Sequence, residues 1–165
     1  MTSDGSRTPS GGIVIIGSLS PEIQEQLAKV ADGKIATVSG VPQTHVLETT
    51  GEDLRRLSER VNKVVGTEGV VAPILADDEG NRLLPTGRMQ VRFKEAPTDK
   101  VLQSFAKRHK VAPGQRNKWS PQQAEFAVRT DDTRYFPDVA AEMEKDSKVA
   151  TAWPDVRAAF RREST

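Results

Sequence analysis

The sequence predicts an α+β fold built from two tandem ferredoxin-like (βαββαβ) units with antiparallel sheets. Short β-branched runs and stretches of alternating apolar and polar residues are separated by segments in which apolar residues recur at helical spacing. Their order is strand, helix, strand, strand, helix, strand, which is the ferredoxin-like pattern, and this order occurs twice. We predict a first unit at residues 13–76 and a second at 77–157. The alternative is a single irregular α+β domain.

Each element of the first unit has a local signal. The β-branched run at residues 13–16 ends at Gly17, which is typical of a buried strand. Ser20 is a suitable N-cap, and Pro21 fits the first helical position, where its missing N–H costs no hydrogen bond. Gly66 ends the second helix. The other predicted elements are the end of the first helix at residue 33, strands at 34–38, 44–49 and 70–75, and a helix starting near residue 52.

The clearest strand of the chain lies in the second unit. Between residues 88 and 94, Met89, Val91 and Phe93 alternate with polar residues, as expected when one face of a sheet is buried. Thr98 is a suitable N-cap for the helix that follows. After that helix we expect a loop or short strand at residues 112–120, a strand at 124–129, a helix at 133–145 and a closing strand at 149–153.

The two ends of the chain lack an apolar pattern. Residues 1–12 are rich in Gly and Ser and are expected to form a flexible, dispensable tail. From Asp155 onward we expect an exposed chain of basic character, with residues 158–165 as the C-terminal tail. The N-terminal segment has no basic stretch followed by an apolar one, so we expect no signal peptide and a cytoplasmic location. No apolar run is long enough to cross a membrane.

Charge and composition narrow the function classes. The chain has 24 Lys and Arg against 23 Asp and Glu, and this balance argues against nucleic acid as the main partner. It has no cysteine, which excludes disulfides and thiolate metal sites. The two histidines, His45 and His109, lack the spacing of a metal-binding pair. We therefore expect neither a metal nor a cofactor.

No segment matches the motifs that carry catalysis. The chain has no Gly-x-Ser-x-Gly segment around a nucleophile, so we expect that it is not an enzyme. His109 lies at a basic helix end and is expected to interact with the helix C-terminus, whereas His45 lies in a predicted strand. The glycines at residues 11–18 lack the spacing of a nucleotide-binding loop. The acidic turn at residues 77–79 lacks the pattern of a calcium loop.

Three segments stand out when they are considered together. They read VAPI at residues 71–74, GNRLLPTGRMQVRFK at 80–94 and VATAWPDV at 149–156. In this order they resemble the propeptide-like N-terminal domain of subtilisin-like serine proteases. In that family a V-x-F-K strand is followed by a helix, a hairpin, a second helix and a closing strand that ends in V-x-x-V-E-x-D. The resemblance covers about half of the chain, and the first unit resembles no family.

The resemblance implies a protein that chaperones or inhibits a protease and does no chemistry itself. Such a propeptide docks its sheet on two surface helices of the protease, and an acidic residue near the end of its last strand caps those helices. The chain then enters the substrate cleft and binds there like a product. Asp155 matches the acidic position, and Trp153 stands where the family has a neighbouring acid. The implied partner-binding residues are Trp153, Asp155, Ala158, Ala159, Phe160 and Arg161.

Three functional hypotheses follow from the sequence. The first is the chaperone or inhibitor of a subtilisin-like protease, encoded separately or within the same precursor. The second is a tandem ferredoxin-like module for small-molecule sensing or protein interaction. The third, RNA binding on an open sheet, has the least support because the central strands lack the aromatic pairs that stack bases. Of the two tryptophans, Trp119 and Trp153, we expect one to pack in the core.

Overall fold

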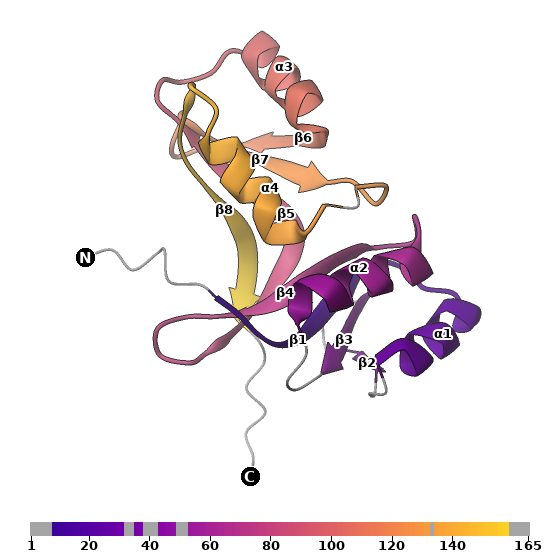
Figure 1. The fold of residues 1–165 in the computed structure, drawn as a ribbon. Coiled ribbons are helices and arrows are strands. Elements are labelled where there is room, and N and C mark those ends of the chain that lie inside the picture. The colour runs from indigo at the N-terminus through magenta and orange to yellow at the C-terminus, as the bar shows by residue number, and fades with distance from the viewer. Residues whose placement is uncertain (1–7, 32–34, 38–42, 49–52, 133, 159–165) are drawn as a thin grey trace.

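The computed structural model describes residues 8–31, 35–37, 43–48, 53–132 and 134–158 (Figure 1). These residues form one eight-stranded antiparallel sheet and four helices, which confirms the predicted α+β class. The strands are β1 (Thr8–Ile16), β2 (Ile35–Thr37), β3 (Thr44–Glu48), β4 (Val70–Ala76), β5 (Arg82–Phe93), β6 (Val111–Arg116), β7 (Gln123–Val128) and β8 (Val149–Ala158). The helices are α1 (Pro21–Ala31), α2 (Leu54–Val65), α3 (Asp99–His109) and α4 (Phe136–Glu144).

The two halves of the chain order their strands in the same way. In the first half, β1 lies between β3 and β4, and β2 pairs with β3. In the second half, β5 lies between β7 and β8, and β6 pairs with β7. The halves join where β4 pairs with β5, with Leu75 opposite Leu83 and Ala76 opposite Arg82. The sheet path is therefore β2-β3-β1-β4-β5-β7-β6, with β8 attached to β5.

The helix starts follow the capping signals of the sequence. The Thr98 side chain accepts a hydrogen bond from the Val101 backbone N–H at 3.2 Å, as its predicted N-cap position requires. The Asp53 carboxylate accepts from the backbone N–H groups of Arg55 and Arg56 at the start of α2. α4 begins at Phe136 and not at residue 133, with a proline in its first turn. The predicted helices are thus confirmed, with their ends moved by a few residues.

The predicted N-terminal tail is wrong for residues 8–12, because β1 already begins at Thr8. Thr8 lies opposite Ala76 and Pro9 opposite Leu75 on β4. The register shifts between Pro9 and Ile13, where Gly11 has a φ of 78°, a conformation that glycine adopts without strain. Sheet pairing uses backbone groups, so a polar, Gly-rich segment can join a ladder when a partner strand extends beside it.

Backbone pairing also extends β5 and β8 beyond their apolar patterns. The exposed tail predicted from Asp155 is therefore wrong for residues 155–158, which belong to β8. β5 begins at Arg82, well before the alternating pattern. Its first residues pair with the end of β8, with Leu83 opposite Ala158 and Pro85 opposite Val156. The prediction ended the strand at Trp153 because the apolar pattern stops there, whereas the ladder continues.

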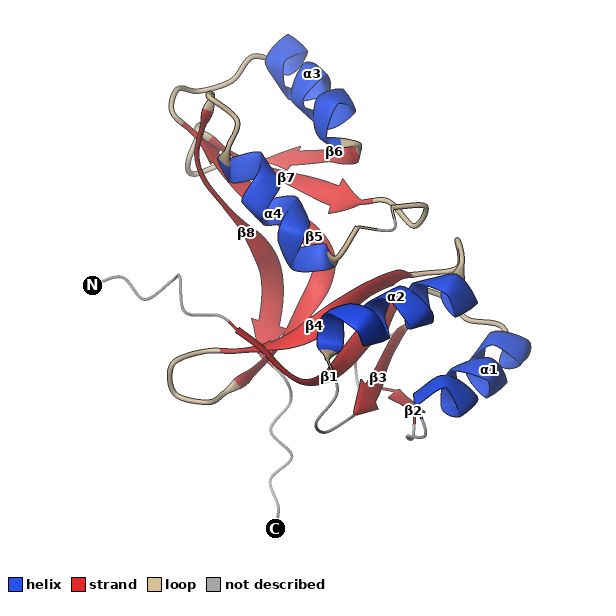
Figure 2. Ribbon diagram, in the orientation of Figure 1, coloured by secondary structure: helices blue, strands red, loops and turns tan. Residues whose placement is uncertain are grey.

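Helices α1 and α2 lie on one side of the first half's sheet (Figure 2). Two apolar clusters lie on opposite faces of this sheet. The smaller cluster joins Ile13, Ile15 and Leu47 to the apolar stripes of α1 and α2. The larger cluster fills the space between the second half's strands and its helices α3 and α4, with phenylalanines 93, 105, 126 and 136 buried in it. Within the described ranges, no helix is both long and apolar enough to cross a membrane.

β4 belongs to both clusters and ties the two halves together. Val71 packs toward α1 and α2, whereas Val70, Ala72 and Ile74 belong to the larger cluster of the second half. On the surface, the Arg55 guanidinium of α2 lies 2.7 Å from the Asp138 carboxylate of α4. The predicted boundary after residue 76 therefore lies at the end of β4, between two paired strands of one sheet. The two halves also share the larger apolar cluster.

Candidate functional site

The face of the second half's sheet that points away from α3 and α4 is the most distinctive surface of the molecule, and we call it the outer face. Met89 and Val91 are buried beneath the helices, so the alternating residues Arg88, Gln90 and Arg92 point the other way. Strand pairing places Glu125 of β7 and Trp153 of β8 on either side of Gln90. The outer face is defined here by Arg88, Gln90, Arg92, Glu125, Trp153 and Asp155.

Gln90 organises the polar groups of the outer face. Its Nε2 donates to Glu125 Oε1 at 3.2 Å and to Asp155 Oδ1 at 3.3 Å. Its Oε1 accepts from Gln123 Nε2 at 3.0 Å. Glu125 also forms an ion pair with Arg88. These contacts run across β7, β5 and β8, so the side chains of Arg88, Gln90, Glu125 and Asp155 are held in place before any partner arrives.

Asp155 is fixed within the chain. Its Oδ2 accepts a hydrogen bond from Thr86 Oγ1 at 2.8 Å, in addition to the contact of Oδ1 with Gln90. The resemblance to subtilase propeptides implies that this carboxylate caps helices of a partner. The structure places it half-buried on β8, and each carboxylate oxygen retains a lone pair for a further donor.

The structure brings together some of the other predicted site residues. Trp153 is half-buried on β8, opposite Gln90 and two positions before Asp155, so both side chains belong to the outer face. Ala158 ends β8, opposite Leu83. Ala159, Phe160 and Arg161 lie outside the described residues. The expectation that one tryptophan packs in the core is wrong, because Trp153 is half-buried and Trp119 is 91% exposed.

The free edge of β8 is blocked against another strand. The Ala152 backbone N–H, which points away from β5, donates to Glu144 Oε2 at 3.1 Å, and the Thr151 hydroxyl donates to the same oxygen at 3.0 Å. Two residues further on, Pro154 has no N–H to offer. A carboxylate and a proline on an edge discourage strand addition. A partner would therefore meet the outer face of the sheet and not this edge.

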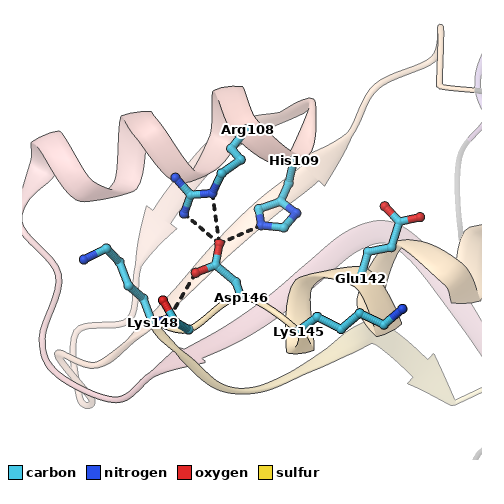
Figure 3. A pocket seen from close by; sticks show the side chains of 7 residues that line it. Arg108, His109, Glu142, Lys145, Asp146 and Lys148 are labelled. Atoms are coloured by element: carbon cyan, nitrogen blue, oxygen red, sulfur yellow. Dashed lines mark hydrogen bonds and ion pairs between the residues drawn. The ribbon is translucent and has the colours of Figure 1, made fainter.

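A second candidate is a shallow pocket of about 480 Å³ at the C-terminal ends of α3 and α4 (Figure 3). At its centre the Asp146 carboxylate accepts from Arg108 Nη2 at 2.6 Å and lies 2.9 Å from His109 Nε2. Burial alone would raise the pKa of Asp146, but the hydrogen bonds from His109, the Lys148 backbone N–H and Arg108 outweigh it and lower the pKa to about 2. We call Asp146, Arg108 and His109 the Asp146 clasp.

The Asp146 clasp joins α3 to the turn before β8. The sequence predicted that His109 interacts with its own helix end, whereas its ring binds Asp146 and Arg134 Nη2 donates to the His109 carbonyl at 2.7 Å. The sequence does not indicate a role for Asp146, because its partners Arg108 and His109 lie far away in the chain and no local pattern predicts such a contact. Since its oxygens already accept four hydrogen bonds from the chain, the carboxylate has little capacity left for a ligand.

Neither of the other polar groups singled out forms a ligand site. The Asp77 carboxylate accepts from the backbone N–H groups of Asn81 and Glu79 within its own turn, and these bonds lower its pKa. His45 is buried on β3 and 7% exposed. In the part of the chain that the structure describes, no cluster of three or more His, Cys, Asp or Glu side chains is arranged to hold a metal ion.

Comparison of the chain with protein-family models, with curated proteins and with solved structures gives no significant match.

Proposed function

We propose that this chain is a non-catalytic, propeptide-like chaperone or inhibitor of a subtilisin-like serine protease. It docks on the protease through the outer face and directs its C-terminal segment into the substrate cleft. The observation that carries the proposal is a sheet face that none of the described helices covers, on which Trp153 lies beside an Asp155 that Thr86 and Gln90 hold in place. Such a face suits docking against surface helices of another protein.

We also propose that the two halves are tandem ferredoxin-like units. In each half the first strand lies between the third and the fourth, and the second strand pairs with the third. This order, together with one helix after each first and third strand, supports the assignment. The second unit then ends with β8, whose last residue, Ala158, directly precedes the segment proposed to fill the cleft.

The fixed position of Asp155 refines its proposed role. Thr86 and Gln90 hold the carboxylate at 2.8 and 3.3 Å, so its remaining lone pairs point in a defined direction. A carboxylate that is already oriented loses less side-chain entropy when it caps a partner helix. The half-buried Trp153 beside it supplies an aromatic contact, the residue type enriched at energetic centres of interfaces.

The test is inhibition of purified subtilisin-like proteases by the whole chain and its variants. Trp153→Ala is expected to weaken inhibition at least tenfold. Truncation after Ala158 leaves β8 intact and removes only the segment proposed for the cleft, so it is also expected to weaken inhibition strongly. Gln103→Ala, at an exposed position of α3 on the opposite side of the sheet, is the matched control. Thermal midpoints of all variants separate loss of docking from loss of folding. Equal inhibition by the truncated and the whole chain would sink the cleft-filling role.

A small-molecule-sensing module is the second candidate, and the pocket beside the Asp146 clasp is the observation that favours it. Lys145 and Lys148 line this pocket together with Arg108, so an anionic metabolite is the ligand to test. The C-terminal ends of α3 and α4 meet there, and their dipoles oppose an anion, which makes this candidate the weaker one. Thermal-shift measurements with small di- and tricarboxylates, compared between the native chain and Lys148→Glu, distinguish it from protease docking.

A further inference from the structure

The loop between β6 and β7 presents Trp119 to solvent in a fixed position. Trp119 is 91% exposed, although burying the large apolar surface of an aromatic side chain is strongly favourable. The Asn117 side-chain oxygen accepts from the backbone N–H groups of Trp119 and Ser120 at 2.7 and 3.1 Å. The Asn117 backbone N–H in turn donates to the Gln123 carbonyl at 3.0 Å. The exposed ring therefore sits on a hydrogen-bonded turn.

A second set of contacts anchors this loop to the end of β5. Gln122 Nε2 donates to the carbonyl oxygens of Phe93 and Lys94 at 3.1 and 2.8 Å. The Phe93 backbone N–H donates to the Gln122 carbonyl at 2.8 Å. These bonds hold the loop against the rest of the second half while leaving Trp119 outside the core. A loop whose backbone is held in this way pays little ordering entropy when a partner covers it.

Three lysines and two exposed carboxylates, Glu95 and Asp99, lie on or near the loop. Lys94, Lys118 and Lys148 are exposed, and within the described ranges no ion pair joins their ammonium groups to a carboxylate. The Lys94 backbone N–H donates to the Lys148 carbonyl at 2.9 Å, so these two lysines lie side by side. Of the nearby carboxylates, Asp99 is already paired with Arg116 at 2.8 Å. A partner surface that fits this end of the molecule is apolar at its centre and acidic at its rim.

The size of the outer face shows why a further contact is needed. The outer face is defined by six side chains, four of them half-buried, whereas a stable protein complex takes about 20–30 residues from each partner. The Trp119 loop adjoins the start of β8, at one end of the outer face.

We propose that Trp119 is an anchor residue that inserts into an apolar pocket with an acidic rim on the protease, outside the substrate cleft. This inference rests on the proposed function and names a second contact with the same partner. Trp119 and the outer face then act together. Trp153 and Asp155 fix the sheet on the protease, while Trp119 and its lysines fix the opposite end of the second half.

The test uses the whole chain labelled with 5-fluorotryptophan, because two tryptophans give two fluorine resonances that Trp119→Phe and Trp153→Phe assign. A subtilisin-like protease whose nucleophilic serine is replaced by alanine is added in excess, so its cleft stays open and nothing is cleaved. We expect the Trp119 resonance to shift and broaden in the complex. Trp119→Ala should raise the dissociation constant at least tenfold and leave the thermal midpoint unchanged, whereas Gln103→Ala should change neither.

Each other outcome overturns the inference in a distinguishable way. Binding with an unchanged Trp119 resonance and an unchanged affinity of Trp119→Ala would overturn the anchor and leave the proposed function standing. Absence of any binding would overturn both. A response of the Trp119 resonance to phosphatidylserine vesicles but not to the protease would assign the loop to a membrane surface, and a response to protein concentration alone would assign it to self-association.

Discussion

The two halves of the molecule share a strand order but differ in what covers their sheets. In the first half, helices α1 and α2 cover one face, and the second half's apolar cluster takes in Val14, Ala72 and Ile74 on the other. In the second half, α3 and α4 cover one face, and the outer face carries a polar network. Two halves with the same order of strands and helices therefore need not have the same function. The first half packs residues of both sheet faces into apolar clusters, whereas in the second half the outer face carries polar side chains that a partner can reach.

The two halves also differ in whether their polar side chains have hydrogen-bond partners. Among the described residues, the buried side-chain atoms without a hydrogen-bond partner are His45 Nδ1 and Ser58 Oγ, and both lie in the first half. In the second half, hydrogen bonds join Arg88, Gln90, Glu125 and Asp155 on the outer face, and others join the three residues of the Asp146 clasp. Side chains bonded in this way keep one arrangement, as a docking surface requires.

The largest expected effect comes from the core that the halves share. Ile74 lies on β4 of the first half but is fully buried in the second half's cluster. Ile74→Ala should lower the free energy of unfolding by about 2–5 kcal/mol, because it removes buried methyl groups and leaves a cavity. Urea unfolding measures the loss, and amide exchange should report it in α4 and β5 as well as in β1. Faster exchange confined to the first half would contradict a shared core.

The Asp146 clasp should make the second half sensitive to acid. The pKa of Asp146 is lowered from 3.8 to about 2 in the folded chain, so its contribution is complete above pH 4 and is lost as the pH falls toward 2. The difference corresponds to roughly 2 kcal/mol.

Urea unfolding between pH 2 and pH 7, measured for the native chain and for Asp146→Asn, isolates the contribution of the Asp146 carboxylate to the free energy of unfolding. The native chain should lose more stability than the variant over pH 4 to 2. Parallel curves for the two proteins would show that the clasp contributes nothing.

Ser58 offers the converse test in the first half. Its hydroxyl is buried on α2 without a partner, which costs free energy relative to an apolar side chain of similar shape. Ser58→Ala should therefore raise the free energy of unfolding by up to about 1 kcal/mol, measured by urea unfolding. Thr98→Ala is the contrasting variant, because it removes a hydroxyl that caps α3 and should destabilise. Destabilisation by both would mean that Ser58 has a partner after all.

The smallest expected effect concerns the surface contact between the halves. Arg55 of α2 pairs with Asp138 of α4 and lies 4.4 Å from the centre of the Tyr135 ring. Both partners of the pair are solvent-exposed, so Arg55→Ala should lower the thermal midpoint only slightly, and less in high salt. A loss as large as that of Ile74→Ala would mean that this contact, and not β4, holds the halves together.

The cores of the elements could be predicted from the sequence, whereas their ends could not. The alternation of Met89, Val91 and Phe93 and the N-cap at Thr98 are local signals that agree with the structure. The pairing of residues 8–12 and 155–158 has no such signal, because backbone groups make the ladder and the choice of partner depends on where β4 and β5 lie. For the same reason Asp155, assigned to a tail from the sequence, is bonded to Thr86 and Gln90.

By itself the sequence determined the fold class, the order of strands and helices and the buried side of the β5 strand, since each depends on spacings within a few residues. Only the tertiary structure decided which sheet face stays open, that β4 is buried on both sides and that Asp146 meets Arg108 and His109. These features join residues that lie far apart in the chain, and hydrophobic burial and charged hydrogen bonds depend on distance in space.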